Sequence, residues 1–197
     1  MDVAERTPAA RGPAPGEAQY ASLALVNTEF ELPTGPYDGL PDAPAARGWL
    51  TTAGLVPART RVDADGAERL RLLRTSVREA FAARIEERPP AADALAHINT
   101  ALDGAPGVRK LSWTARGPAV EVRRRADAPL ETALTVLAED AVELLAGPVG
   151  AKLSACGAQG CTRLFVRAHA SRRWCSDRCG NRVRAVRHYA DRTRRPK

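Results

Sequence analysis

The chain has 197 residues, of which 44% are apolar and 27% charged, so it can hold one domain plus a small module and is too apolar for wholesale disorder. Its net charge is +7, but residues 156–197 carry twelve basic and two acidic residues, whereas residues 1–155 carry eighteen basic and twenty-one acidic ones. No uncharged apolar run reaches the roughly 18 residues of a membrane-spanning helix, and no apolar segment follows a basic start, so we expect a cytoplasmic protein without a signal peptide.

Short elements separated by loops are predicted at the N-terminal end. Residues 1–19 are rich in Ala, Pro and Gly without periodicity, which predicts a disordered segment. Residues 23–28 begin the ordered part as a short helix or strand, a Pro- and Gly-rich loop follows over residues 33–44, and residues 45–54 form a helix.

Two amphipathic helices come next. Asp65 is expected to cap a long helix over residues 66–88, which ends before a Pro-Pro pair. Its buried stripe is predicted to consist of Leu70, Leu73, Val77, Phe81 and Ile85. A second helix spans residues 91–102, and its predicted inward residues are Leu95, Ile98 and Leu102.

A hairpin and a central helix complete this part of the chain. Residues 108–114 and 119–124 are predicted as two strands, because alternating residues flank a Gly-Pro turn and Val120 and Val122 alternate with charged residues. A helix then begins near Pro129 and ends at a Gly-Pro pair. We therefore expect an α+β, mostly α-helical domain over residues 20–148 with one small β-hairpin or sheet, which folds without metal.

All four cysteines lie within 24 residues, with the spacing C-x4-C-x13-C-x3-C. They are Cys156, Cys161, Cys175 and Cys179. Two close pairs separated by a short loop are typical of a tetrahedral zinc site, and four thiolates leave a zinc ion no open position for catalysis. Two disulfides or a redox pair are the alternatives, but no export signal and no C-x-x-C motif support them. The spacing predicts one structural zinc ion per chain.

The surroundings of these cysteines predict a small treble-clef-like zinc finger over residues 153–192, followed by a basic tail over residues 193–197. Residues 164–166 form a short strand, and a helix runs from Ser176 to about Asp191. One face of that helix is predicted to hold Cys175, Cys179, Val183, Val186 and Ala190, and the opposite face Asn181, Arg184, His188 and Arg192.

The basic-Trp lead-in at residues 172–176 and the Cys-Gly-Asn-Arg string at residues 179–182 resemble the CGNR zinc finger. The resemblance implies that this segment binds DNA. The nucleic-acid-binding residues that we expect are Arg167, Arg172, Arg173, Asn181, Arg182, Arg184, Arg187, His188 and Arg192. Asn181 and Arg182 follow a ligand so closely that bracing of the zinc site is the alternative role for them.

A second resemblance covers about residues 20–146 and rests on several short motifs in order. These are Leu25-Val26-Asn27-Thr28, Asp38 with Leu40, Trp49-Leu50 with Gly54-Leu55, and Leu73-Arg74 with Arg78. Together they are similar to the ABATE domain, which commonly precedes a CGNR finger and is described as a stress-induced transcription regulator. Four polar residues are candidates for a ligand pocket, with internal hydrogen bonding as the favoured alternative: Asn27, Arg74, Arg78 and Asn99.

Nothing in the sequence points to catalysis, because it has no nucleophile elbow, phosphate-binding glycine loop or metalloprotease motif. We expect a non-enzymatic, zinc-dependent DNA-binding protein of bacterial type, which is a transcription regulator with an N-terminal sensory or assembly domain. The sequence leaves open whether a small-molecule effector acts on that domain. RNA or ribosome binding by the basic finger is one alternative. Docking of the finger on an acidic protein partner is another. The sequence leaves the oligomeric state open.

Overall fold

The computed structural model describes residues 12–32, 35–124 and 127–194, except the side chains of residues 32 and 190–194. The helices are α1 (Ala21–Val26), α2 (Ala43–Thr52), α3 (Ala64–Ile85), α4 (Ala92–Gly104), α5 (Pro129–Ala146), the 3-10 turn η3 (Gly150–Lys152) and α6 (Asp177–Arg194). The strands are β1 (Glu29–Leu32), β2 (Gly35–Asp38), β3 (Val108–Thr114), β4 (Gly117–Arg123), β5 (Leu153–Ala155) and β6 (Leu164–Val166). The predicted class, mostly helical with small sheets and a C-terminal zinc finger, is confirmed.

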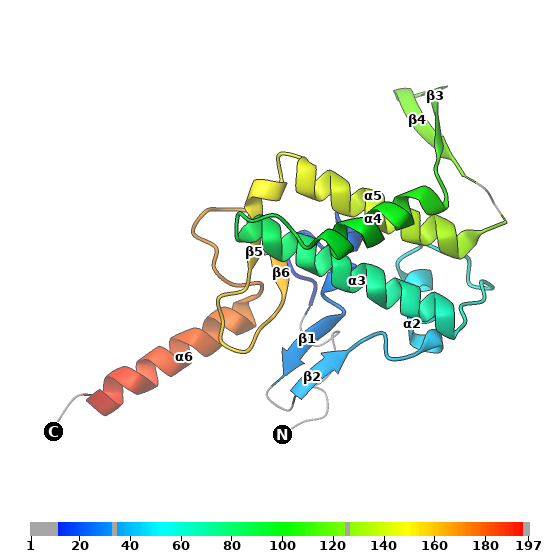
Figure 1. Ribbon diagram of the computed structural model, residues 1–197. Helices are drawn as coiled ribbons and strands as arrows, with labels where there is room; N and C mark the ends of the chain where they lie inside the picture. Colours follow the sequence, from blue (N-terminus) through cyan, green and yellow to red (C-terminus); the bar gives the residue numbers. More distant parts are fainter. Residues whose placement is uncertain (1–11, 33–34, 125–126, 195–197) are drawn as a thin grey trace.

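Helix α3 is the centre of the body, and α1, α2, α4 and α5 all pack against it (Figure 1). Its apolar residues recur every three or four positions, so they form one stripe that the other helices bury. The fully or nearly fully buried members are Leu70, Leu73, Val77 and Phe81. Asp63, and not Asp65 as predicted, caps the helix, because its carboxylate accepts a 2.8 Å hydrogen bond from the Gly66 amide.

The body contains two hairpins where the sequence predicted one. Strand β2 lies within residues 33–44, which we expected to form a loop, and it pairs antiparallel with β1, with Glu29 opposite Asp38. Strand β1 alternates polar and apolar residues over only four positions, which is too short to be a clear signal, and Phe30 packs on Tyr37 across the pair with ring centroids 4.9 Å apart. Leu95 of α4 is a further correction, because it is 45% exposed whereas Ile98 faces the core.

The disorder predicted for residues 1–19 is wrong for residues 12–19, and residues 1–11 lie outside the described part. Residues 12–19 form a turn that packs against the zinc finger. Ala14 is 2% exposed, among the cysteines and Phe165. Glu17 accepts hydrogen bonds from Asn27 and Arg163, both at 2.6 Å. These long-range partners explain why local composition failed to predict the order.

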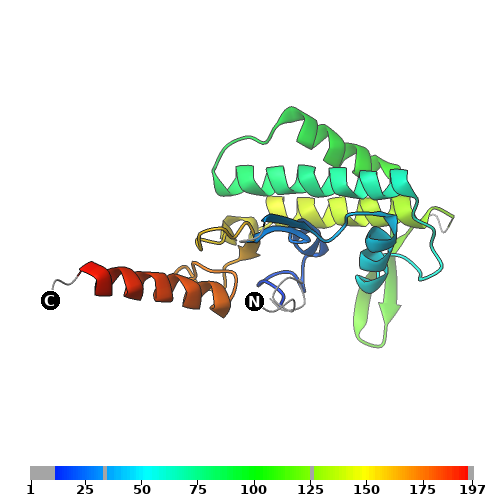
Figure 2. The same cartoon turned by 90° about the horizontal axis from the view of Figure 1, so that it is seen from below.

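Two elements project from opposite ends of the helical body, as Figures 1 and 2 both show. One is the β3–β4 hairpin, and the other is α6, the last helix of the zinc finger. No helix in the described part of the chain is both long and apolar enough to cross a membrane.

Candidate zinc centre and nucleic-acid interface

The four cysteine sulfurs form one cluster in which all lie within 4.8 Å of one another. The Sγ atom of Cys175 is 3.8 Å from those of Cys161 and Cys179. A tetrahedral zinc ion with Zn–S bonds of about 2.3 Å places its sulfurs about 3.8 Å apart, so these distances fit zinc. Cys156, Cys175 and Cys179 are buried and Cys161 is half-buried, which closes the site. The residues present therefore suit one structural zinc ion.

The first ligand pair is held by the turn between β5 and β6. The Cys156 amide donates to the Arg163 carbonyl at 3.0 Å, and the Cys161 amide donates to Ala158 at 3.0 Å. Gly160 has a φ of +67°, a left-handed conformation that favours glycine. The tight turn thereby aims both sulfurs at the same point.

The second ligand pair is held by the start of α6. Ser176 caps the helix, since its hydroxyl accepts a 3.3 Å hydrogen bond from the Cys179 amide. The Cys175 amide lies 3.4 Å from the Cys156 sulfur and donates to it, which links the two pairs and stabilises a thiolate.

In the protein chain without a metal ion, three of the neighbouring thiols strongly shift one another's pKa values. Hydrogen bonds from the Cys161 and Cys175 thiols hold the pKa of Cys156 far below its usual range. The hydrogen bond to Cys156 raises the pKa of Cys161 to about 11, and hydrogen bonds to Cys156 and Cys161 raise the pKa of Cys175 above its usual range. Crowded sulfurs cannot all ionise without a cation, and a divalent ion supplies the missing charge.

The glycine of the Cys-Gly-Asn-Arg string makes room for Trp174. A Cβ atom on Gly180 would lie 3.2 Å from the Trp174 ring and 3.3 Å from the Arg184 guanidinium. That guanidinium lies over the same ring, 5.8 Å from its centroid, and donates to the Asn181 side-chain oxygen at 2.5 Å. Trp174 and Asn181 therefore hold Arg184 in one orientation at the surface.

The predicted nucleic-acid-binding residues separate into exposed and bracing groups. The exposed ones are Arg173, Asn181, Arg184, Arg187 and His188. Arg182 is half-buried and donates to the Gln159 carbonyl at 2.8 Å, and Arg172 donates to the Trp174 carbonyl at 3.0 Å. Both contacts tie these side chains to the segments that carry the cysteines, which is the geometry that the bracing role considered for Arg182 requires. Arg167 is also half-buried, and the side chain of Arg192 lies outside the described residues.

A groove of about 610 Å³ lies beside this surface. It is lined by Glu31, Gly157, Gln159, Gly160, Arg182, Val183, Val186 and Arg187. Val186 was predicted to face inward with the zinc ligands, but it is 61% exposed. The correction arises because the inner contacts of α6 end near Val183, beyond which the helix extends past the finger (Figure 1).

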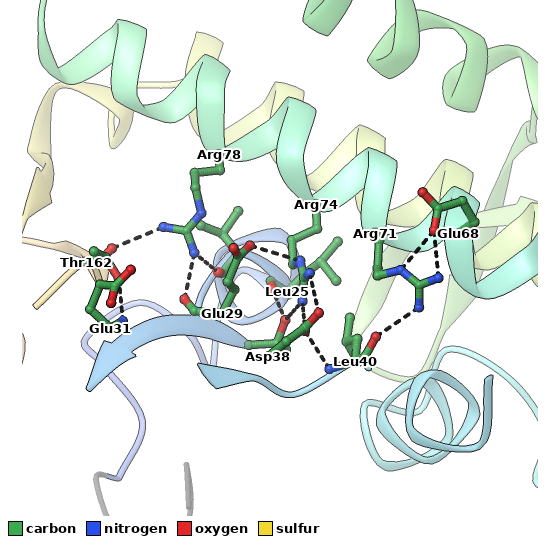
Figure 3. A network of polar contacts seen from close by, with 12 residues as sticks. Leu25, Glu29, Glu31, Asp38, Leu40, Glu68, Arg71, Arg74, Arg78 and Thr162 are labelled. Carbon is green, nitrogen blue, oxygen red and sulfur yellow. Dashed lines mark hydrogen bonds and ion pairs between the residues drawn. The ribbon is translucent and has the colours of Figure 1, made fainter. Parts of the chain in front are cut away.

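Three arginines on one face of α3 fasten the β1–β2 hairpin and the finger to the body (Figure 3). Arg71 donates to the Leu40 carbonyl at 3.0 Å. Arg74 donates to both carboxylate oxygens of Asp38, at 2.5 and 3.1 Å, and so lowers the pKa of Asp38. Spacings of three and four residues place these guanidinium groups in a row.

Arg78 joins the body to the finger. Its guanidinium donates to the carbonyl oxygens of Val26 at 2.5 Å, Glu29 at 2.7 Å and Thr162 at 3.1 Å. Burial lowers its pKa. Thr162 follows a zinc ligand directly, and its hydroxyl accepts a 3.1 Å hydrogen bond from the Glu31 amide. Neither Thr162 nor Glu31 carried a signal in the sequence, because both act through partners far away in the chain.

Asn27 makes a second connection to the finger. Its side chain donates to the Leu164 carbonyl at 2.8 Å and accepts from the Leu164 amide at 2.9 Å. The side-chain amide of Asn27 and the terminal guanidinium nitrogens of Arg74 and Arg78 thus donate to the protein itself, although the Nε atoms of both arginines are buried without a hydrogen-bond partner in the described part of the chain. Asn99 is exposed on α4. For the first three, the structure favours internal hydrogen bonding over a ligand pocket.

The finger and the body also share apolar contacts. Leu153 and Leu164 of the β5–β6 sheet belong to the same buried cluster as the core of α3 and α5. Arg163 between the ligands is 5% exposed and holds the N-terminal turn through Glu17 and the Gly12 carbonyl. No residue pattern pointed to Arg163 before the structure was known.

A closed four-cysteine site followed by an exposed basic helix, attached to a helical body, defines a zinc-finger protein. Comparison with protein families agrees: the ABATE family, described as "Putative stress-induced transcription regulator", matches residues 20–148, and the CGNR zinc finger matches residues 152–192. The chain belongs to the ABATE family and carries a C-terminal CGNR zinc finger. No curated protein matches the chain.

Proposed function

We propose that the protein is a DNA-binding transcription regulator whose helix α6 contacts duplex DNA. The observation that carries the proposal is the exposure of α6: every residue from Arg184 to Tyr189 is exposed, and the helix projects from the body (Figure 2). This helix lies in the segment with twelve basic and two acidic residues. Exposed cations on a projecting helix suit the phosphate backbone of a nucleic acid.

The dimensions of α6 suit the major groove of DNA. With 18 residues the helix is about 27 Å long, and a helix of about 10–12 Å diameter fits a groove about 12 Å wide. Arg184 is already oriented by Trp174 and Asn181, so it loses little side-chain entropy when it meets a phosphate or a base edge. Arg187 and His188 extend the same exposed surface.

The zinc ion supplies folding free energy and no reaction in this proposal. Four thiolate ligands leave it no open position, and we propose that the protein acts by binding rather than catalysis. The proposal places it in the cytoplasm, where thiols stay reduced. The ABATE domain serves as the sensory or assembly part, and its contacts through Arg78 and Asn27 support a fixed placement of the finger.

Selection from a random duplex pool, followed by titration of the enriched site, tests the proposal. The enriched site is expected to bind at least about 1000-fold more tightly than random DNA at physiological salt. With about four to six phosphate contacts, log K should fall with log salt with a slope near −4 to −5.

A charge-reversed variant tests the role of α6. Arg184→Glu with Arg187→Glu should weaken binding to every sequence while one zinc ion per chain is retained. The matched control is Arg59→Glu with Arg61→Glu, which makes the same charge change at exposed positions of the body. Equal weakening by both variants would show that only net charge matters and would contradict the proposed interface.

The alternatives give different results in the same assays. Enrichment of structured RNA without enrichment of duplex DNA would replace the proposal by RNA binding. If neither nucleic acid is selected and a protein partner stays bound at high salt, the finger is a protein-interaction module.

A further inference from the structure

The β3–β4 hairpin has one apolar face and one polar face. Leu111 is paired with Val120, Trp113 with Pro118 and Arg109 with Val122, so these six residues share a face. The other face is mostly polar and carries Val108, Lys110, Ser112, Thr114, Gly117, Ala119, Glu121 and Arg123. The pattern is that of strands with one side against a core, as the sequence predicted.

The core against which this face should pack is not supplied by the described part of the chain. Leu111 is 74% exposed, Trp113 78%, Val120 55% and Val122 49%. Figure 1 shows the hairpin standing away from the helices. An isolated two-stranded hairpin is marginal in water, and a contiguous apolar patch of this kind marks an interaction surface.

We propose that the apolar face of the β3–β4 hairpin docks on the same face of a second copy of this chain. The whole exposed surface of Leu111, Trp113, Val120 and Val122 is about 500 Å² in each copy, so face-to-face packing buries at most about 1000 Å² in total, the lower bound for a specific interface. An identical patch on both partners is what a twofold-symmetric contact requires.

The charge distribution on the hairpin favours a protein partner with the same apolar face. Lys110, Glu121 and Arg123 lie on the opposite face and stay in water when two copies stack. Arg109 stands at the base of the apolar face, where its long side chain reaches the rim of the contact. A surface for DNA would instead place its cations on the contacting face.

Pairing of two chains through their hairpins is compatible with the proposed DNA binding but does not depend on it. The hairpin and α6 project from opposite ends of the body, so pairing through the hairpins leaves both finger helices accessible. Two accessible helices are what a regulator with two half-sites presents to DNA. Association of the chains is measurable without any nucleic acid, so failure of one proposal is distinguishable from failure of the other.

Sedimentation velocity of the full, zinc-loaded chain tests this interface. The wild type should sediment as a dimer of 21.1 kDa chains at micromolar concentration, and Leu111→Ser with Trp113→Ser should weaken association at least about 100-fold. The matched control is Leu72→Ser with Leu95→Ser, which removes apolar side chains that are 42% and 45% exposed on helices of the body. The control should remain dimeric.

Fluorescence gives a second measurement that does not rely on a disruptive variant. Trp113 is strongly exposed in the single chain, so its emission should shift to the blue as concentration rises, and Trp113→Phe should abolish the shift. The proposal is overturned if the wild type is still monomeric at about 100 micromolar, which is about 100 times the concentration at which a dimer of micromolar affinity forms. A dimer that survives the hairpin substitutions also overturns it, as does a monomer whose hairpin binds anionic phosphatidylserine vesicles.

Discussion

Replacement of Arg78 by Met should uncouple the zinc finger from the body. The guanidinium of Arg78 donates to three carbonyl oxygens that belong to α1, β1 and the first zinc-ligand turn. Met retains most of the apolar stem but donates no hydrogen bond, so all three carbonyls lose this partner at once.

The magnitude follows from these contacts. A hydrogen bond from a charged donor contributes about 1.5–3 kcal/mol, and three such bonds are lost. The desolvation of the guanidinium, which lowers the pKa of Arg78, offsets part of that gain in the wild type. We therefore expect the free energy of unfolding to fall by about 3 kcal/mol.

Arg69→Met is the matched control, because it makes the same change on the same helix. Arg69 pairs with Glu131 at 2.5 Å, but the two side chains are 42% and 32% exposed. The pair is bidentate, with a second hydrogen bond of 2.6 Å, but both side chains are partly in water, so its loss should cost only about 1 kcal/mol, well below the loss in Arg78→Met.

Urea unfolding of the zinc-loaded full chain measures the difference between the two variants. Hydrogen exchange in the turn around Thr162 should also speed up in Arg78→Met and stay unchanged in Arg69→Met, because only Arg78 donates to that turn. The reasoning is refuted if both variants lose the same stability or if exchange near Thr162 does not respond to Arg78→Met.

Three further predictions concern the metal, the pH dependence of stability and the packing inside the finger. Removal of zinc by a chelator, or Cys161→Ser, should unfold the finger and also lower the melting temperature of the body helices, because Leu164 of the finger lies in the core that the two parts share. Circular dichroism measures this melting, and an unchanged melting temperature would contradict the prediction. Arg74 holds the pKa of Asp38 below its ordinary value of about 3.9. The stability that this ion pair contributes is therefore present above about pH 4 and is lost as the pH falls through the pKa of the folded state. When the free energy of unfolding is measured between about pH 5 and pH 2, Asp38→Asn should make it fall less steeply with decreasing pH than in the wild type. Gly180→Ala should weaken zinc affinity in a competition assay with a chromophoric chelator, since the new methyl group would press on the Trp174 ring, and an unchanged affinity would show that the ring moves aside freely.

Features with a local cause could be predicted from the sequence alone. The spacing of the four cysteines determines a zinc site because each pair comes from one turn, and the structure brings all four sulfurs together. The stripe from Leu70 to Phe81 determines the inner face of α3, since the 3.6-residue period of a helix places those side chains on one side. Helix ends marked by Pro and Gly were predicted within a few residues.

Features that depend on distant partners were decided only by the tertiary structure. The order of residues 12–19 comes from Arg163 and Asn27, and the contact of Arg182 with the zinc turn is made through the Gln159 carbonyl. The attachment of the finger to the body is of the same kind, because Arg78 meets Thr162 across 84 residues of chain. Sequence periodicity reports which face of an element is apolar, but only the packed chain shows whether that face is covered; the β3–β4 hairpin has the pattern of a buried strand pair, and its apolar face is exposed.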